Sequence, residues 1–184
     1  GGSGSDARGA ARNGGPRRFV QDCGMRMEAL SAELTRVVAE ACVEFHGMSG
    51  IEWTLSRGEG TWTRLEILGH LIDSARNNHE RMARAVAQGE LEWPYYDQDA
   101  MVRVHRYGLA APGFLVSVWE AQNLELARLV GLIPEERLGT MCRIGDGEPV
   151  TLEFLGHDYV EHMQHHLRQI LDGGAGGVRW VDLA

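Results

Sequence analysis

Lysine is absent from this chain of 184 residues: all 18 basic residues are arginine, against 26 acidic residues, and the net charge is −8. We interpret the missing lysine as a habit of genomic base composition. Arg76, Arg81 and Arg84 form a small basic group, but Glu80 and Glu90 dilute it, so we interpret the group as a solvated helix face. Because nucleic-acid binding needs a patch or stripe of positive charge, this composition argues against a nucleic-acid partner.

Long apolar runs are missing too. The longest strictly apolar stretches are a few residues, such as Phe-Leu-Val at 114–116. A membrane helix needs about 20 such residues, so no membrane association is expected. The sequence does not open with a positively charged segment followed by an apolar one, which argues against a secretory signal.

Cysteine is scarce and scattered. Cys23, Cys42 and Cys142 fit neither a disulfide framework nor a paired Cys-x-x-Cys metal site. A reducing cytoplasm is therefore the expected location. Cys42 falls on an apolar helical stripe, so we expect a buried packing residue rather than a nucleophile.

Apolar residues recur at steps of three and four, the pattern of amphipathic helices, in four segments of the chain. These segments are residues 19–45, about 62–88, 112–130 and 152–171. Gly89 suits a helix end, Pro112 a first helical turn and Thr151 an N-cap.

The connections between these helices include two long ones. We expect a short helix over 98–106 in one, and a small hairpin at "IGDGEPV" in the other. The prediction is an all-α four-helix bundle with long crossover connections over 19–172. A disordered tail, 1–18, precedes it, and a C-terminal extension, 173–184, follows it.

The segment "DYVEHMQHHLRQI" contains three histidines within five residues. His162 and His166 are one helical turn apart, so both imidazoles can point at one atom. His165 falls away from the apolar stripe and stands four residues after Glu161, so we expect it to face outward. Met163 occupies the place where the zincin signature needs a glutamate, which argues against a metalloprotease.

The second helix carries a polar strip at helical spacing beside its apolar stripe: Glu66, His70, Asp73 and Asn77. Such a strip either lines a cavity inside a bundle or forms a solvated edge. His79 lies on the opposite side, in phase with apolar residues, and is predicted to be a core or interface histidine.

Three segments, "TWTRLEILGHLIDS", "YYDQDAMV" and "HDYVEHMQHHLRQI", resemble the DinB-like family of bacterial four-helix proteins over residues 25–172. Members of that family carry a metal on three histidines, one from the second helix and two from the last. The resemblance implies His70, His162 and His166 as the ligands here. Related proteins are thiol S-transferases that use bacillithiol or mycothiol, mycothiol-dependent isomerases and metal-dependent hydrolases.

Three imidazoles on a divalent ion leave a coordination position open, as in catalytic rather than structural sites. Nitrogen ligands suit zinc or nickel best, with iron, copper or manganese as further possibilities. By resemblance, we expect a metal-dependent transferase that activates a low-molecular-weight thiol for attack on an electrophile. The alternatives are a metal-dependent hydrolase, a stress-linked protein that binds metal without catalysis, or a plain helical dimer whose inward histidines are satisfied by hydrogen bonds.

Residues around the expected site fall into two groups. The candidates for orienting the ligating imidazoles are Asp73, Asp158 and Gln169. The candidates for walls of the pocket are Trp93, Tyr95 and Tyr96, although exposed polar residues and ordinary aromatic packing are alternatives. A small-molecule substrate and a homodimer complete the expectation.

Overall fold

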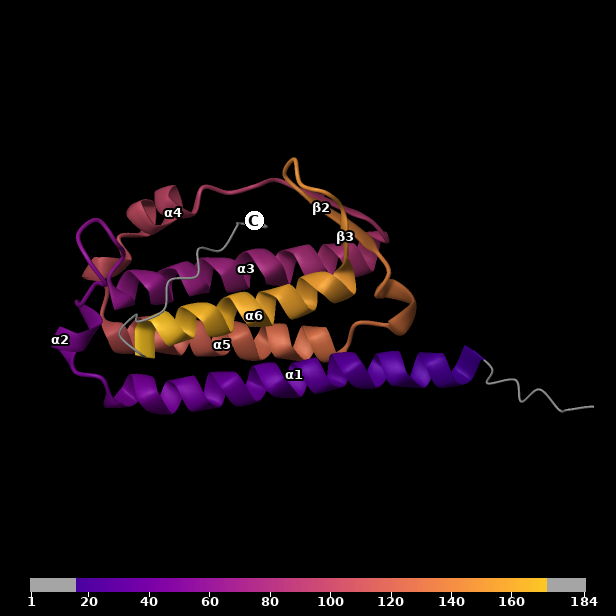
Figure 1. Ribbon diagram of the computed structural model, residues 1–184, viewed down its shortest axis with the longest axis horizontal. Coiled ribbons are helices and arrows are strands. Elements are labelled where there is room, and N and C mark those ends of the chain that lie inside the picture. The colour runs from indigo at the N-terminus through magenta and orange to yellow at the C-terminus, as the bar shows by residue number, and fades with distance from the viewer. Residues whose placement is uncertain (1–15, 172–184) are drawn as a thin grey trace, which may run out of the picture.

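The computed structural model describes residues 16–171, with side chains from Met27 onward. Four long helices run side by side (Figure 1), which confirms the predicted four-helix bundle. They are α1 (Pro16–Gly47), α3 (Arg64–Gln88), α5 (Pro112–Gly131) and α6 (Leu152–Leu171). Helix α1 begins three residues before the expected start at 19. The remainder of the predicted tail and the C-terminal extension lie outside the described residues.

Local capping chemistry sets the ends of these helices. Thr63 caps α3: its hydroxyl accepts from the Glu66 backbone N–H, and the Glu66 carboxylate accepts from the Thr63 N–H at 2.8 Å. The same helix ends at Gly89, whose φ of 81° suits glycine. Pro112 stands in the first turn of α5, and the Thr151 hydroxyl accepts from the Phe154 N–H at the start of α6. The three predicted boundary residues are therefore confirmed.

The core lies where the four long helices face one another. Its fully buried large side chains include Leu34, Leu68, Leu71, Ile72, Trp119, Leu126, Leu152, Met163 and Ile170. Cys42 is buried among them, as predicted, and burial followed by the charge of Glu120 raises the pKa of its thiol to about 11. None of the helices in the described range 16–171 is long and apolar enough to cross a membrane.

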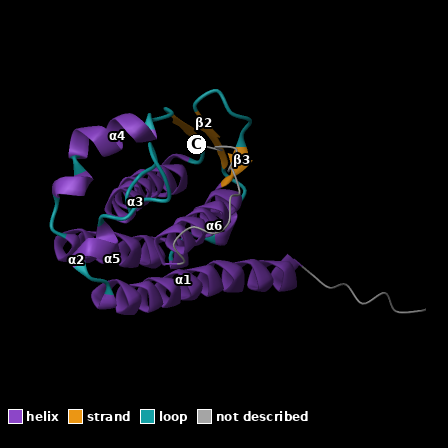
Figure 2. Ribbon diagram, turned by 60° about the vertical axis from the view of Figure 1, so that its left-hand side comes forward, coloured by secondary structure: helices purple, strands orange, loops and turns teal. Residues whose placement is uncertain are grey.

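The connection from α3 to α5 returns along the length of the bundle, so that α5 starts at the same end as α3 (Figure 1). It contains β1 (Leu91–Trp93), α4 (Gln98–His105) and the 3₁₀ turn η1 (Tyr107–Leu109). From α5 to α6 the chain passes through η2 (Glu135–Arg137), β2 (Met141–Ile144) and β3 (Val150–Thr151). Figure 2 shows α4 and the strands on the opposite side of α3 and α6 from α1.

The predicted hairpin is present as the antiparallel pair β2–β3. Two further features were not predicted from the sequence. Strand β1 pairs in parallel with β2, with Leu91 opposite Cys142 and Trp93 opposite Ile144, which makes a three-stranded sheet. A one-turn helix, α2 (Gly50–Trp53), lies between α1 and α3, where Ser49 and Glu52 form a capping box.

The connection from α3 to α5, called the crossover below, packs against α3 beside His70. The Tyr107 ring packs directly over Gly69, where a Cβ atom would lie 2.1 Å from Cδ2 and from Cγ of the ring. The Tyr107 hydroxyl donates to Oδ1 of Asp73 at 2.7 Å, and Arg76 and His105 lie 3.4 Å from the two oxygens of the same carboxylate. Gly69 and Asp73 thus position the crossover relative to the helix that carries His70.

Candidate metal centre

His70 of α3 meets His162 and His166 of α6 between the two packed helices. One nitrogen from each ring can be chosen so that all three lie within 4.8 Å of one another. Nε2 of His70 is 3.3 Å from Nε2 of His162, and the ring centroids are 4.6–5.2 Å apart. The structure therefore brings together the three imidazoles that the resemblance implied. That they bind metal stays a prediction.

The triad fits a divalent cation on two counts. Two nitrogen ligands at about 2.05 Å from a tetrahedral ion lie about 3.3 Å apart, and the His70–His162 spacing is 3.3 Å. His70 is only 1% exposed, so water does not reach the ring nitrogen that faces His162. A cation shared by the three rings would compensate for placing these lone pairs close together in a buried site.

Burial keeps the three rings in the form that ligates metals. Burial, and then the neighbouring imidazoles, lower the pKa of His70 to about 2. Burial is also the largest cause that lowers the pKa of His162 to about 4 and that of His166 to about 3. All three imidazoles are therefore neutral at pH 7, with a lone pair available for a cation.

Gln169 is the predicted orienting residue that contacts the triad. Nδ1 of His166 lies 2.9 Å from Oε1 of Gln169, and since an amide oxygen only accepts, the His166 Nδ1–H donates. This hydrogen bond leaves the His166 Nε2 lone pair free for a ligand. The Gln169 amide in turn donates to Nε2 of His165 at 2.7 Å.

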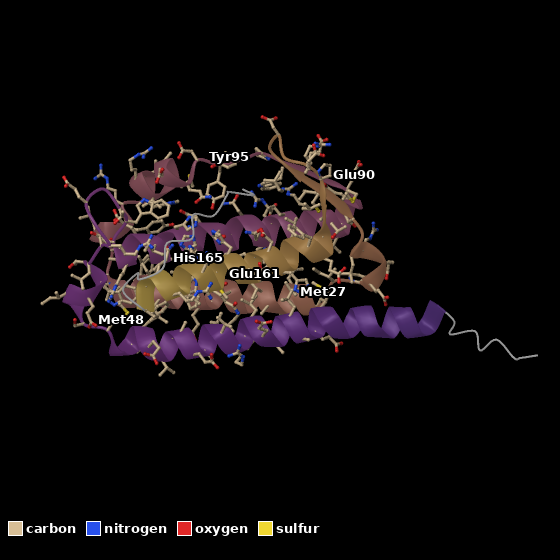
Figure 3. All side chains as sticks on the ribbon, viewed as in Figure 1. Met27, Met48, Glu90, Tyr95, Glu161 and His165 are labelled. Atoms are coloured by element: carbon tan, nitrogen blue, oxygen red, sulfur yellow. The ribbon has the colours of Figure 1, made fainter. Side chains whose placement is uncertain are left out.

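The prediction that His165 faces outward is wrong. The side chain, labelled on α6 in Figure 3, is only 6% exposed. Burial, and then Arg168 and Arg57, lower the pKa of His165. Arg57 belongs to the segment between α2 and α3, so a loop from elsewhere in the sequence approaches this end of α6. A helical wheel contains no information about such a loop.

The other two orienting candidates make no hydrogen bond to the triad within the described residues. Asp73 is 2% exposed and accepts from Tyr107 instead. Asp158 is half-buried and lines a different cavity, of about 360 Å³, beneath the β2–β3 hairpin. Burial, and then the charge of Glu161, raise the pKa of the Asp158 carboxyl.

The three aromatic residues predicted as pocket walls are not among the residues that line the cavity at His166. Trp93 packs against Arg84, whose guanidinium carbon is 5.5 Å from the ring centroid. Tyr95, labelled on the crossover in Figure 3, lines the cavity that contains Asp158. Tyr96 is half-buried and interacts electrostatically with Arg81.

The cavity beside the triad has a volume of about 270 Å³. Its lining consists of Arg57, Gly60, Thr61, Trp62, Ile67, Asp99, His166 and Gln169. The Trp62 ring centroid is 5.1 Å from that of His70. Sequence reasoning missed Trp62, Arg57 and Asp99. Helical spacing gave no signal for Trp62, because it precedes the Thr63 N-cap and so lies outside α3.

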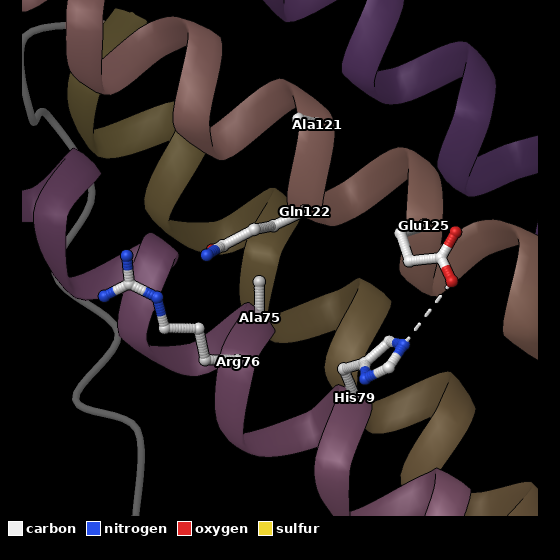
Figure 4. Close-up of a pocket in the computed structure, with 6 residues that line it drawn as sticks. All are labelled: Ala75, Arg76, His79, Ala121, Gln122 and Glu125. Atoms are coloured by element: carbon white, nitrogen blue, oxygen red, sulfur yellow. Dashed lines mark ion pairs between the residues drawn. The ribbon is translucent and has the colours of Figure 1, made fainter.

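His79 lies at a surface cleft between α3 and α5 (Figure 4). Its side chain is 35% exposed, and its Nε2 is 3.9 Å from a carboxylate oxygen of Glu125. The prediction of a core histidine is therefore wrong, because the ring lies at the cleft and about a third of its side chain is exposed. The alternative, an interface histidine, stays a prediction.

Comparisons with known proteins identify relatives of the fold. The family model described as the DinB superfamily matches residues 27–170. Among solved structures, the chain is similar to YfiT from Bacillus subtilis, described as a probable metal-dependent hydrolase with an unusual four-helix bundle topology. The TM-score is 0.63 at 21% identity, over 89% of this chain and 90% of YfiT. A comparison with curated proteins gives no match.

Proposed function

Since this chain belongs to the DinB superfamily, we propose that His70, His162 and His166 bind one divalent metal ion and that the protein is a metal-dependent enzyme acting on a small molecule. The observation that carries the proposal is the convergence of three neutral imidazoles, with ligand atoms within 4.8 Å of one another. Zinc and nickel are the first candidates, because all three protein ligands are imidazole nitrogens. The description of YfiT as a probable metal-dependent hydrolase supports the same reading.

A metal ion bound here would lower the pKa of a thiol or of water in its open position and so supply a nucleophile near neutral pH. The chain's own residues do the rest. Gln169 holds the His166 tautomer whose Nε2 is free. Trp62 shields His70 from solvent on one side, and the Asp99 carboxylate lines the cavity, where it can accept a proton. The Arg57 side chain adds a positive charge at the same cavity.

Transfer of a low-molecular-weight thiol to an electrophile is the first candidate reaction, in keeping with the sequence resemblance to bacillithiol- and mycothiol-dependent enzymes. In this reaction a thiol loses its proton to water, its sulfur forms a bond to the electrophilic carbon, and the leaving group departs with the electron pair of the broken bond.

Hydrolysis is the second candidate. Asp99 favours it, since a carboxylate at the cavity can take the proton from water during attack on an ester or amide carbon. The description of YfiT points the same way. A third possibility is that the protein binds metal without catalysing a reaction. It involves the same three histidine ligands and predicts that no product forms.

The candidates are separated by product analysis of metal-loaded, tag-free protein. Bacillithiol and mycothiol are each incubated with 1-chloro-2,4-dinitrobenzene, and a parallel set receives nitrophenyl esters and anilides without thiol. The matched variants are His70→Ala and, as a control, His157→Ala, because His157 is exposed on the same helix as His162.

Thiol conjugate that forms with wild type and His157→Ala, but not with His70→Ala, supports transfer. The same pattern with esters or anilides supports hydrolysis. If the wild-type rates are no higher than those of His70→Ala in both sets, the enzyme proposal is contradicted. The third possibility, a protein that binds metal without catalysis, then stands. The expected homodimer remains a proposal that light scattering of the purified protein tests.

A further inference from the structure

Arg81 of α3 is a buried cation with two guanidinium nitrogens that have no hydrogen-bond partner among the described residues. The side chain is 5% exposed, and neither Nε nor Nη2 makes a hydrogen bond to any described residue. The interpretation of Arg81 as part of a solvated helix face is therefore wrong. Arginine is almost never this buried unless it is paired, because an unpaired buried charge costs several kcal/mol.

The two unpartnered nitrogens form one edge of the guanidinium group. On that edge the Nε–H and one Nη2–H point in parallel, with a spacing that matches the two oxygens of a carboxylate. A single carboxylate would therefore satisfy both donors. A single hydroxyl or carbonyl oxygen would accept from one of the two N–H donors, or from both with poor geometry.

Two ionisable groups from other elements act on Arg81, namely Tyr96 of the crossover and Asp158 of α6. Burial lowers the pKa of the guanidinium, while these two groups raise it. Asp158 is the acidic one of the two, yet no ion pair joins it to Arg81 in the described chain. Asp158 instead lines the cavity of about 360 Å³ under the hairpin.

Arg81 and the triad lie along one seam of the bundle, by which we mean the contact between α3 and α6. Arg81 follows His70 by eleven residues, which is three helical turns with a rotation of only about 20°, so both face the same side of α3. Ser74 and Asn77, which are polar, lie between them on that face. Across the seam, Asp158 precedes His162 by one turn of α6. Along α3 the separation from His70 to Arg81 is about 16 Å.

We propose that Arg81 binds a carboxylate group of the small molecule whose reactive group lies at the histidine triad. The proposal rests on the function proposed above and specifies its substrate class. The ligand is an elongated molecule with a carboxylate up to about 16 Å from its reactive atom, the rise of α3 between the two residues. A singly charged carboxylate is preferred to a phosphate dianion, because Asp158 and the net charge of −8 repel additional negative charge.

The first test asks whether Arg81 has a structural partner. The midpoint of thermal unfolding is measured for wild type, Arg81→Met and Asp158→Asn in the absence of added carboxylates. We expect Arg81→Met to unfold at a midpoint several degrees higher, because methionine removes an unpaired buried charge at similar volume. A midpoint that falls in Arg81→Met and falls equally in Asp158→Asn would show a structural ion pair and overturn the proposal.

The second test measures carboxylate binding directly on the metal-free protein. The ¹⁵N–¹H signal of the Arg81 Nε–H is assigned by its loss in Arg81→Gln, and hexanoate is titrated against hexanamide as the neutral control. We expect a saturable downfield shift with hexanoate only, and tighter binding in Asp158→Asn because a like charge is gone. Equal responses to the acid and the amide, or no saturable response, would overturn the proposal.

The third test links Arg81 to the metal centre. Cobalt-loaded protein is titrated with 8-mercaptooctanoate and with 8-mercaptooctanamide, and the thiolate-to-cobalt absorption band is followed. Wild type should bind the acid at least 10-fold more tightly than the amide, and Arg81→Gln should bind both equally. Equal affinities in wild type would overturn the proposed link. If neither thiol gives the band, the function proposed for the triad fails, whereas the second test still decides whether Arg81 binds carboxylates.

Discussion

The contact of Tyr107 with Gly69 makes Gly69→Ala a sharp test of how the crossover is held on α3. The added Cβ would lie 2.1 Å from Cδ2 and Cγ of the Tyr107 ring, whereas carbon atoms in contact are about 3.5–4.0 Å apart. The ring must therefore move by roughly 1.5 Å, which breaks the 2.7 Å hydrogen bond from its hydroxyl to Asp73. Asp73 is buried, so its carboxylate cannot exchange that donor for water.

The expected loss of stability follows from three terms. Overpacking costs about 1–3 kcal/mol, and the lost hydrogen bond to a charged acceptor costs about 1.5–3 kcal/mol. Replacing glycine by alanine within a helix returns about 1 kcal/mol. The free energy of unfolding, measured by urea denaturation, should therefore fall by roughly 1.5–5 kcal/mol.

Gly156→Ala is the matched control, since Gly156 is also buried within a long helix. There the new Cβ would meet only the ends of flexible side chains, Leu30 at 3.2 Å and Met27 at 3.3 Å. We expect its stability to stay within about 1 kcal/mol of wild type. The reasoning is refuted if Gly69→Ala is as stable as Gly156→Ala, or if adding Tyr107→Ala to Gly69→Ala restores none of the lost stability in a double-mutant cycle.

Three further predictions concern the buried polar groups. Gln169→Ala should weaken zinc affinity about 10- to 100-fold, measured by chelator competition, because the His166 ring loses the acceptor that orients it; unchanged affinity would contradict this. Tyr159→Phe should lower the free energy of unfolding by about 1–3 kcal/mol, because it removes the hydroxyl that donates to the fully buried Asn123 side chain. A urea denaturation curve that gives the same free energy of unfolding as wild type would contradict this prediction. The metal-free protein should lose stability as the pH falls below about 6.5, since unfolded imidazoles gain protons there while the triad, with pKa values lowered by burial, stays neutral in the fold. The free energy of unfolding should fall by at most about 1.4 kcal/mol per pH unit for each ring. If denaturation curves show no decline in this free energy from pH 7 to 5, the buried rings are not neutral.

The bundle could be predicted from sequence because its helices carry their own signals. Gly89, Pro112 and Thr151 mark boundaries through local backbone chemistry, and the apolar stripes between them identify the buried faces. The one-turn spacing of His162 and His166 likewise needs only the helical repeat. Pairing β1 with β2 was out of reach, because residues 91 and 142 meet only after the crossover has folded back, and three-residue strands have almost no pattern of their own.

The site was predictable only in part, because its surroundings come from distant segments. His70 was chosen through the resemblance, since periodicity alone gave a polar strip with either a cavity or solvent beside it. Arg81 and His165 were both expected to face water and are both buried. A single helix shows which residues share a face, but not that the crossover lies near Arg81 or that the loop carrying Arg57 reaches His165.

The central claim is that three imidazoles from two helices share one cation. Chelator-treated, tag-free protein titrated with zinc in a calorimeter tests it most directly, with His70→Ala and His162→Ala as the site variants and His157→Ala as the control. The account predicts one equivalent of zinc for wild type and His157→Ala, with affinity at least 100-fold lower in both site variants. Zinc binding to wild type that is no tighter than binding to His70→Ala would contradict it.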